Sequence, residues 1–442
     1  MSIRREITPL LILALLPAPA MAQAGRVSFA VRDSAGVQIA RNGGEEDAAA
    51  AASLELRIGV VDGDTIYQFH DIGPIAVDRD GTIFVVNGTL TVRVYDAEGR
   101  FVRQFGRRGA GPGELRSVDR LWFAGDSLIV YERRVQRATA FRAADGTVID
   151  TWTLRLPAGA HAEPVARTSS GILAWVRPPS RHFELPLGTL FRDTSDFRLL
   201  HPGTGATGAV LRRQASDRRI GATEVYPVGP LFEPRSITAF GADGTQYHAA
   251  AGQYAIDVFD PLGRLVRRII RAIEATPIES RHVDALKDGI GRGRRLEGSE
   301  LGDAILRAEK YPLAPSFQQI GAILPAPDGS LLVQRIDDVD PIALERRAGF
   351  GSDDRAITVS RTQGARWERF DPRGRYTGAV LFPARFQPRH FDGRRVTGVL
   401  EDEDGVQFIA RYGIGGDRAG PGVDGAGLTG LGFKPAAGWA AS

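Results

Sequence analysis

The sequence predicts an all-β protein of the six-bladed β-propeller class. Three observations lead to this prediction: short β-branched and aromatic runs separated by Asp/Gly turns, recurrence of that turn along the chain, and a strand-like stretch near the N-terminus that matches one missing from the C-terminal end. A hydrophobic share of 43% in 442 residues is ample for the core of such a fold.

The first blade is the clearest copy of the repeat. Within residues 75–115, the turns Asp78-Arg79-Asp80-Gly81 and Asp96-Ala97-Glu98-Gly99 separate short apolar runs. The runs at residues 75–77, 83–86, 92–95 and 101–105 predict a four-stranded antiparallel meander. The Gly-rich stretch 106–113 lies between predicted strands and lacks the Gly-Lys-Ser/Thr ending of a phosphate-binding loop, so we interpret it as the connection to the second blade.

The inner turn of this blade recurs, which is the test for a repeat fold. Six short turns precede β-rich runs, at Asp80-Gly81, Gly125-Asp126, Ser170-Gly171, Asp243-Gly244, Asp328-Gly329 and Asp404-Gly405. A second series marks the outer hairpins, at residues 96–99, 144–146, 201–205, 260–263 and 371–374. The sequence therefore predicts six blades.

The predicted sixth blade lacks its outer strands, because the regular pattern stops near Ile414. FVRQFG, at residues 101–106, is the outer strand that comes before the inner turn Gly125-Asp126. LELRIG, at residues 54–59, stands in the same position before the inner turn Asp80-Gly81, so we expect it to be the outer strand of the last blade. Residues 28–40 are expected to add a neighbouring strand or hairpin, and residues 42–53 a loop or an Ala-rich helical turn. Closure by N-terminal strands leaves few exposed edges.

Residues 276–315 interrupt the blade spacing between the fourth and fifth blades. Thr276-Pro277-Ile278-Glu279 has the spacing of a capping box with proline at the first helical position. A helix from there would place Ile278, Val283, Leu286 and Ile290 at spacings that share one face, and a second helix is expected over residues 299–310. The sequence thus predicts a small helical insert.

Composition points to an exported protein. Residues 1–22 have the basic start, short apolar run and Ala20-Met21-Ala22 cleavage site of a secretory signal peptide, and we expect the protein to be secreted or periplasmic. No later stretch reaches the roughly 20 apolar residues needed to span a bilayer. Without cysteine the chain has neither disulfides nor thiolate metal sites.

The remaining predictions concern partners and domains. A net charge of +3 is too small for a nucleic-acid partner, and the many arginines are interpreted as a general compositional bias. We expect a monomer with one propeller domain at residues 26–414. The Gly/Ala-rich residues 415–442 are expected to be a disordered tail.

Several motifs resemble those of a known family. IAVDRDGTIFVVN, VYDAEGRFVRQFG and GAGPGEL are similar to NHL-type repeats, and the layout resembles exported bacterial six-bladed β-propeller proteins. Features common in that group appear as RDSAG at residues 32–36, YQFH at residues 67–70 and the insert at residues 276–310. The resemblance implies the fold and export, and it implies no particular activity.

Candidate binding residues lie in the loops that lead from each outer strand to the next inner strand, because these loops surround the mouth of a propeller's channel. A solvated rim is the ordinary role for each of them taken singly. The candidates are His70, Asp71, Arg116, Asp119, His161, Glu163, Glu233, Arg235, Gln318 and His390, with Gln319 and Arg389 beside them.

Our leading hypothesis is a non-enzymatic propeller that binds a protein, peptide or glycan at this mouth. The alternative is a metal-dependent hydrolase or lyase of the lactonase or amidating-lyase type. Lactonase-type sites use Asn ligands, and Asn42 and Asn87 are the only asparagines. His70, His161, His248 and His390 could supply zinc ligands, but no short His-spaced motif links them.

Two Asp-rich turns are candidate calcium sites. Asp402 to Asp404, and Asp337, Asp338 and Asp340, lack the twelve-residue loop pattern of an EF-hand, which favours turn formation. We therefore expect no resident cofactor, with calcium or zinc as the open alternatives.

Overall fold

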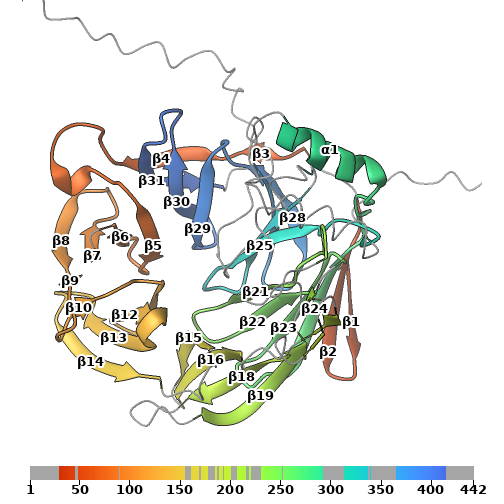
Figure 1. The fold of residues 1–442 in the computed structure, drawn as a ribbon, viewed down its shortest axis with the longest axis horizontal. Coiled ribbons are helices and arrows are strands. Elements are labelled where there is room, and N and C mark those ends of the chain that lie inside the picture. Colours follow the sequence, from red (N-terminus) through yellow and green to blue (C-terminus); the bar gives the residue numbers. More distant parts are fainter. Residues whose placement is uncertain are drawn as a thin grey trace, which may run out of the picture.

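The computed structural model shows six β-sheets of four to six strands arranged as blades in a ring (Figure 1). It describes residues 29–44, 48–88, 90–154, 161–168, 171–177, 185–186, 189–192, 194–200, 207–215, 219–220, 230–250, 252–291, 313–336, 339 and 365–414. This arrangement is a six-bladed β-propeller, as the sequence predicted. The proposed signal peptide and the C-terminal tail lie outside the described residues.

The first three blades are each one four-stranded sheet. Blade one contains β5 (Ile72–Val77), β6 (Ile83–Asn87), β7 (Thr91–Tyr95) and β8 (Phe101–Phe105). Blade two contains β11 (Arg120–Ala124), β12 (Ser127–Glu132), β13 (Arg137–Arg142) and β14 (Val148–Thr153). Blade three contains β15 (His161–Thr168), β16 (Gly171–Arg177), β18 (Thr194–Leu200) and β19 (Thr207–Ala215).

The last three blades each include a strand from the N-terminal segment. Blade four contains β21 (Ile237–Phe240), β22 (Gln246–Ala249), β23 (Ala255–Phe259), β24 (Leu265–Arg271), β2 (Val37–Asn42) and β1 (Phe29–Ser34). Blade five contains β25 (Ile320–Pro325), β26 (Leu331–Arg335), β27 (Arg366–Phe370), β28 (Tyr376–Leu381) and β3 (Ala50–Ala51). Blade six contains β29 (Phe386–Phe391), β30 (Arg395–Glu401), β31 (Gln407–Gly413) and β4 (Ser53–Ile58).

The N-terminal segment follows the outer edges of these three blades. β4 pairs antiparallel with β31, which agrees with the expected role of LELRIG in the last blade. The expected hairpin also forms, but it lies on blade four, where β2 pairs parallel with β24; our expectation that it would neighbour the last blade is wrong. The Ala-rich stretch is extended rather than helical, because β3 pairs with β28.

Buried Asn42 explains why the hairpin lies on blade four. Its side-chain Nδ2 donates to Gly374 O (2.9 Å) and Ile270 O (3.3 Å), and its Oδ1 accepts from the backbone N–H of Tyr376 (2.8 Å). One asparagine thereby joins the N-terminal strand to blades four and five. Such amide hydrogen bonds are specific to the position, and hydrophobic periodicity does not reveal them.

The sixth blade differs from the prediction in its strand order. β29 is its inner strand, and the turn joining β29 to β30 contains Asp392-Gly393, not Asp404-Gly405. The latter turn joins the second strand to the third. The error arose because both turns have the same Asp/Gly chemistry, so that turn residues alone do not count strands.

The connections between strands divide the ring into two faces. The turn face carries the turns between the first and second and between the third and fourth strands of each blade. The mouth face carries the other connections, including those between blades. Turn-face aspartates accept hydrogen bonds from backbone N–H groups two and four residues ahead, as Asp96 does from Glu98 and Arg100. Asp78, Asp260 and Asp371 repeat this geometry.

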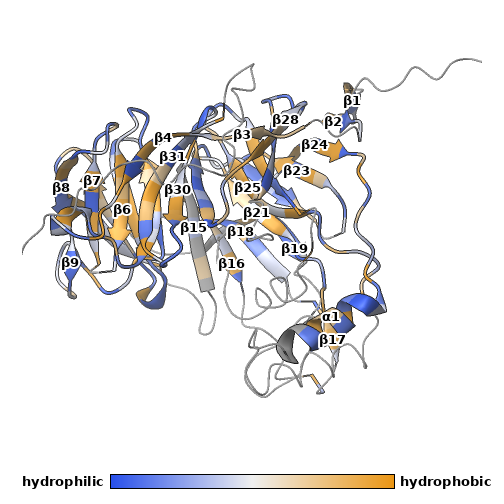
Figure 2. Ribbon diagram, turned by 90° about the horizontal axis from the view of Figure 1, so that it is seen from above, coloured by the Kyte–Doolittle hydropathy of each residue, from blue (hydrophilic) through white to orange (hydrophobic). Residues whose placement is uncertain are grey.

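The insert contributes one described helix, α1 (Ser280–Gly291), on the mouth face (Figure 2). The predicted capping box is wrong: Pro277 forms a bridge with Ser316, so the helix begins at Ser280 instead. Leu286 of α1 packs with Leu231, Phe232 and Phe317 in one apolar cluster. The predicted second helix, at residues 299–310, lies outside the described residues.

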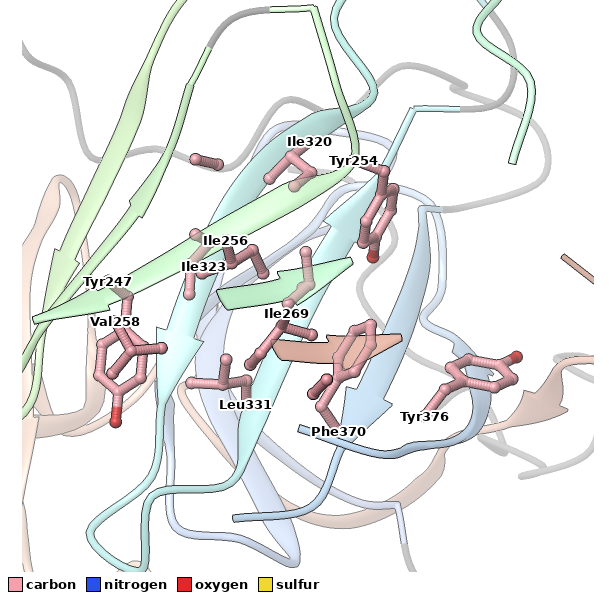
Figure 3. Close-up of a cluster of buried hydrophobic side chains, with 13 residues drawn as sticks. Tyr247, Tyr254, Ile256, Val258, Ile269, Ile320, Ile323, Leu331, Phe370 and Tyr376 are labelled. Atoms are coloured by element: carbon pink, nitrogen blue, oxygen red, sulfur yellow. The ribbon is translucent and has the colours of Figure 1, made fainter. Parts of the chain in front are cut away.

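Apolar side chains fill the spaces between adjacent blades. Figure 3 shows the cluster between blades four and five, in which Ile256 and Ile269 of blade four pack with Leu331 and Phe370 of blade five. Comparable clusters join blades one and two, two and three, five and six, and six and one. Because burial holds each blade to its neighbours, the mouth-face loops stand on a fixed ring.

Candidate functional site

His70 and Asp71 immediately precede β5, the inner strand of blade one, and both are exposed. The backbone N–H of His70 donates to Asn87 Oδ1 (3.2 Å), and Asn87 Nδ2 donates to Gln68 O (3.3 Å). Asn87 is buried, and these two hydrogen bonds fix the backbone of the loop against blade one. The His70 and Asp71 side chains are not used in these contacts and stay at the surface of the mouth.

The YQFH motif around His70 has a structural role. The Tyr67 hydroxyl accepts from the backbone N–H of Phe101 (3.0 Å), and Phe69 is buried. Arg93 donates to Gln68 O (2.8 Å) and Ile66 O (3.1 Å). The motif therefore anchors the loop on blade one, and only its last residue is displayed.

Arg116 lies in the connection to blade two, and its side chain is exposed. Its backbone N–H donates to Oε1 of Glu132 (2.7 Å), whose side chain is fully buried. Glu132 Oε2 accepts from Arg137 Nε (2.5 Å), and Arg137 Nη2 donates to Glu114 O (2.6 Å). This buried pair holds the connection against the second blade and leaves the Arg116 guanidinium group at the surface.

Asp119 is used within the fold. Its Oδ2 accepts from the Ser117 hydroxyl (3.0 Å) and from the backbone N–H of Arg133 (2.8 Å). Gln318 is similar: it is buried, its Oε1 accepts from the backbone N–H of Arg235 (3.2 Å), and its Nε2 donates to Ile320 O (3.3 Å). Glu233 and Arg235 precede β21 and are partly buried.

Three candidates lie in strands rather than in loops, which corrects their predicted placement. His161 and Glu163 are the first and third residues of β15. His390, with Arg389, lies inside β29, because the sixth blade begins one strand earlier than predicted. Burial lowers the pKa of His390.

The four histidines considered as zinc ligands are not one set. His248 lies in β22, is buried, and its Nδ1 is 3.1 Å from Thr238 Oγ1. Burial, with repulsion from Arg212, lowers its pKa to about 4. Within the described residues, no group of three or more His, Asp or Glu side chains is close enough to share a metal ion. Asn42 and Asn87 are both engaged in the fold.

The Gly-rich connection after blade one is closed by its own carboxylate. Glu114 Oε2 accepts from the backbone N–H groups of Ala110 and Gly111 (both 2.9 Å). A Cβ at Gly109 would lie 2.0 Å from that oxygen, so a larger residue there would displace the Glu114 carboxylate. The two N–H groups that could have received a phosphate are thus occupied. Similarly, Asp402 caps Asp404 and Val406 N–H groups (3.1 and 2.8 Å), as a turn residue does.

The prediction missed the arginines beside Arg116. Arg107 and Arg108 form β9 (Arg107–Arg108), which pairs with β10 (Glu114–Leu115), and Arg133 and Arg134 lie in the short helix η2 (Arg133–Val135). Both elements lie in mouth-face connections of blades one and two, and all of these arginines are exposed. Two Arg-Arg doublets in successive connections were the available signal, hidden by the arginine-rich composition.

The three comparisons with known proteins add little beyond the fold. No family model and no curated protein sequence matches the chain. A protein from Bacteroides fragilis described as exported is 11% identical, with a TM-score of 0.44 over 85% of this chain and 98% of that one. A DUF4221 family member from Bacteroides vulgatus is 10% identical, with a TM-score of 0.47 over 82% and 98%.

Regucalcin from Agrobacterium tumefaciens, described as calcium-binding, is 11% identical, with a TM-score of 0.35 over 83% of this chain and 97% of that one. These similarities are too low to transfer any property, and the propeller assignment rests on the six sheets. Among the described residues, no helix is long and apolar enough to cross a membrane.

Proposed function

We propose that this protein is an exported, non-enzymatic β-propeller that binds a protein, peptide or glycan on its mouth face. One observation carries the proposal. In blades one and two, the buried side chains of Asn87 and Glu132 accept hydrogen bonds from the backbone of the mouth-face loops, while the side chains of His70, Asp71 and Arg116 remain exposed. A rim whose backbone is already fixed loses little conformational freedom when it binds a ligand.

The shape of the mouth face supports recognition of a large ligand. Blade four is followed by the longest connection of the ring, which carries α1, whereas blades five and six are joined by residues 382–385. Figure 1 places α1 across the ring from β5 and β12. The face is therefore raised at α1, and His70, Asp71 and Arg116 lie in connections of blades one and two, away from α1.

A display selection tests the proposal. A random peptide library is selected on the wild-type protein, and the enriched peptides are then measured against a variant carrying His70→Ala and Arg116→Ala. The matched control carries Arg79→Ala and Arg264→Ala, which change the turn face. We expect binding to fall at least about tenfold in the first variant only. Enriched peptides that bind both variants equally would overturn the mouth-face assignment.

Turnover of a lactone or a peptide amide would contradict the non-enzymatic part of the proposal. The decisive form of that result is hydrolysis or lysis that requires a stoichiometric bound metal and is lost in His70→Ala. Metal content measured on the purified wild type and on His70→Ala, together with both assays, provides the comparison.

A further inference from the structure

The connections of blades one and two carry a surplus of positive charge at the surface. Five exposed arginines lie in residues 106–119 and 132–136, and they are Arg107, Arg108, Arg116, Arg133 and Arg134. We refer to these five as the basic rim. Arg107 pairs with Glu114 (2.8 Å) and Arg133 with Asp119 (3.5 Å). Within the described residues, Arg108, Arg116 and Arg134 have no ion pair.

Several turn-face arginines, by contrast, pair with turn aspartates. Arg79 pairs with Asp126 (3.0 Å) and Arg100 with Asp96 (2.7 Å). Arg142 and Arg264 likewise pair with Asp145 and Asp260. Glu132, at the mouth-face end of β12, is buried and already pairs with Arg137, so its charge is not available to the rim.

The backbone that carries the rim is fixed at several points. Arg137 donates to Glu114 O, Arg116 N–H donates to Glu132, and Arg133 N–H donates to Asp119. Only the arginine side chains therefore remain to be ordered by a ligand. Guanidinium groups bind carboxylates through two parallel hydrogen bonds, so an array of them favours a ligand with several carboxylates.

An apolar surface lies in the preceding connection of the same face. Val60 and Val61 are 38% and 63% exposed, and Val60 N–H donates to Tyr67 O (3.0 Å), which fixes this loop on blade one. The same connection carries the exposed acids Asp62, Asp64 and Asp71, so it does not extend the cationic surface of the basic rim.

We propose that the basic rim binds an acidic peptide segment of a partner protein. This inference rests on the proposed function and specifies the ligand class. The segment would place carboxylates on Arg108, Arg116 and Arg134. Because the rim is exposed, the attraction is screened by salt.

Fluorescence anisotropy with a labelled peptide of alternating Glu and Leu residues tests this proposal. A second peptide with Gln in place of Glu is the ligand control. The protein variants are Arg108→Glu with Arg116→Glu and Arg134→Glu, and, as the matched control, Arg79→Glu with Arg100→Glu and Arg264→Glu. Thermal unfolding of both variants checks that they are folded.

We expect the Glu peptide to bind the wild type at low salt, the rim variant to bind at least about tenfold more weakly, and the turn-face variant to bind within about twofold of the wild type. Failure of the Glu peptide to bind, equal binding of the Gln peptide, or equal loss in both variants would overturn the proposal. Binding of a sulfated oligosaccharide without binding of the peptide would also overturn it. Display-selected peptides that lack acidic residues yet need His70 and Arg116 would leave the proposed function standing.

Discussion

The two faces of the propeller handle charge in different ways. On the turn face, partly exposed aspartates cap the backbone of their own turns, and several turn-face aspartates also pair with nearby arginines. By contrast, Glu132, at the mouth-face end of β12, and Glu368, inside β27, are fully buried and hold arginines within the fold. The repeated Asp/Gly sequence therefore specifies the turns of the turn face, whereas the connections of the mouth face differ from one blade to the next.

Glu368 lies close to more arginines than Glu132 does. It lies between blades four and five, where Arg271 contacts its Oε1, and Arg335 and Arg366 lie 3.4 and 4.0 Å from the same oxygen. Arg271 also lies over the ring of Tyr376, with Cζ 3.7 Å from the ring centroid. This carboxylate thus lies close to three cations at one blade interface.

Of the substitutions proposed here, replacing Glu368 should lower the free energy of unfolding most. In Glu368→Gln, buried guanidinium groups lose their compensating charge, and we expect a loss of about 3–5 kcal/mol in the free energy of unfolding. Glu98→Gln, at an exposed turn-face pair with Arg100, is the matched control and should show no measurable change. Urea unfolding measures both. Equal losses would mean that the two faces do not differ as described.

Glu132→Gln should have the next largest effect. The amide still accepts from Arg116 N–H but no longer carries the charge that pairs with Arg137, so we expect a loss of about 2–3 kcal/mol. The matched control is Asp126→Asn, which removes the exposed pair with Arg79. Peptide binding to the rim should weaken in Glu132→Gln alone. Unchanged stability and unchanged binding would show that the buried pair does not position the rim.

Asn42→Leu tests the attachment of the N-terminal segment. It removes the three hydrogen bonds that join β2 to blades four and five, and we expect a loss of about 2 kcal/mol. Gln38→Leu on the same strand is the control, since Gln38 contacts the exposed side chain of Arg267 and should matter much less. A larger effect in the control would place the attachment elsewhere along the strand.

Asp145 gives a smaller, pH-dependent effect on the turn face. Hydrogen bonds from the Thr147 backbone N–H and hydroxyl, and then from Arg142, lower the pKa of Asp145 from 3.8 to about 2. Because the pKa is depressed in the folded state, the stabilisation is present above the unfolded-state pKa and is lost as pH falls through about 2.

Asp145→Asn should therefore differ from the wild type by a constant amount above pH 3.8, and the two should converge toward pH 2. Acid titration of stability, with Asp145 followed by carbon-detected NMR, measures this. A wild-type carboxyl that titrates near 3.8 would contradict the described hydrogen bonds.

Much of the scaffold could be predicted because local chemistry specifies it. Asp and Gly favour the turns wherever they occur, so five inner turns and the outer strand at residues 53–58 were placed correctly. The strand count of blade six was wrong because Asp392-Gly393 and Asp404-Gly405 look alike. The hairpin position depends on the long-range hydrogen bonds of Asn42, which no local pattern reveals.

The mouth was predicted in part. His70, Asp71 and Arg116 are exposed as expected, because residues just before an inner strand must lie at one end of the channel. His390 was misplaced together with its strand. The basic rim was missed because arginines are frequent throughout this sequence. Which of them lack an acidic partner at the surface depends on which carboxylates are buried, and burial depends on how the blades pack against one another.

Hydrogen exchange measured by mass spectrometry, with and without a saturating mouth-selected peptide, tests most directly whether the mouth face is the recognition face. The account predicts slower exchange in residues 59–71, 106–119 and 132–136, with the turns at residues 78–81, 96–99 and 260–263 unchanged. Protection confined to those turns, or no protection in the three mouth-face segments at saturation, would contradict it.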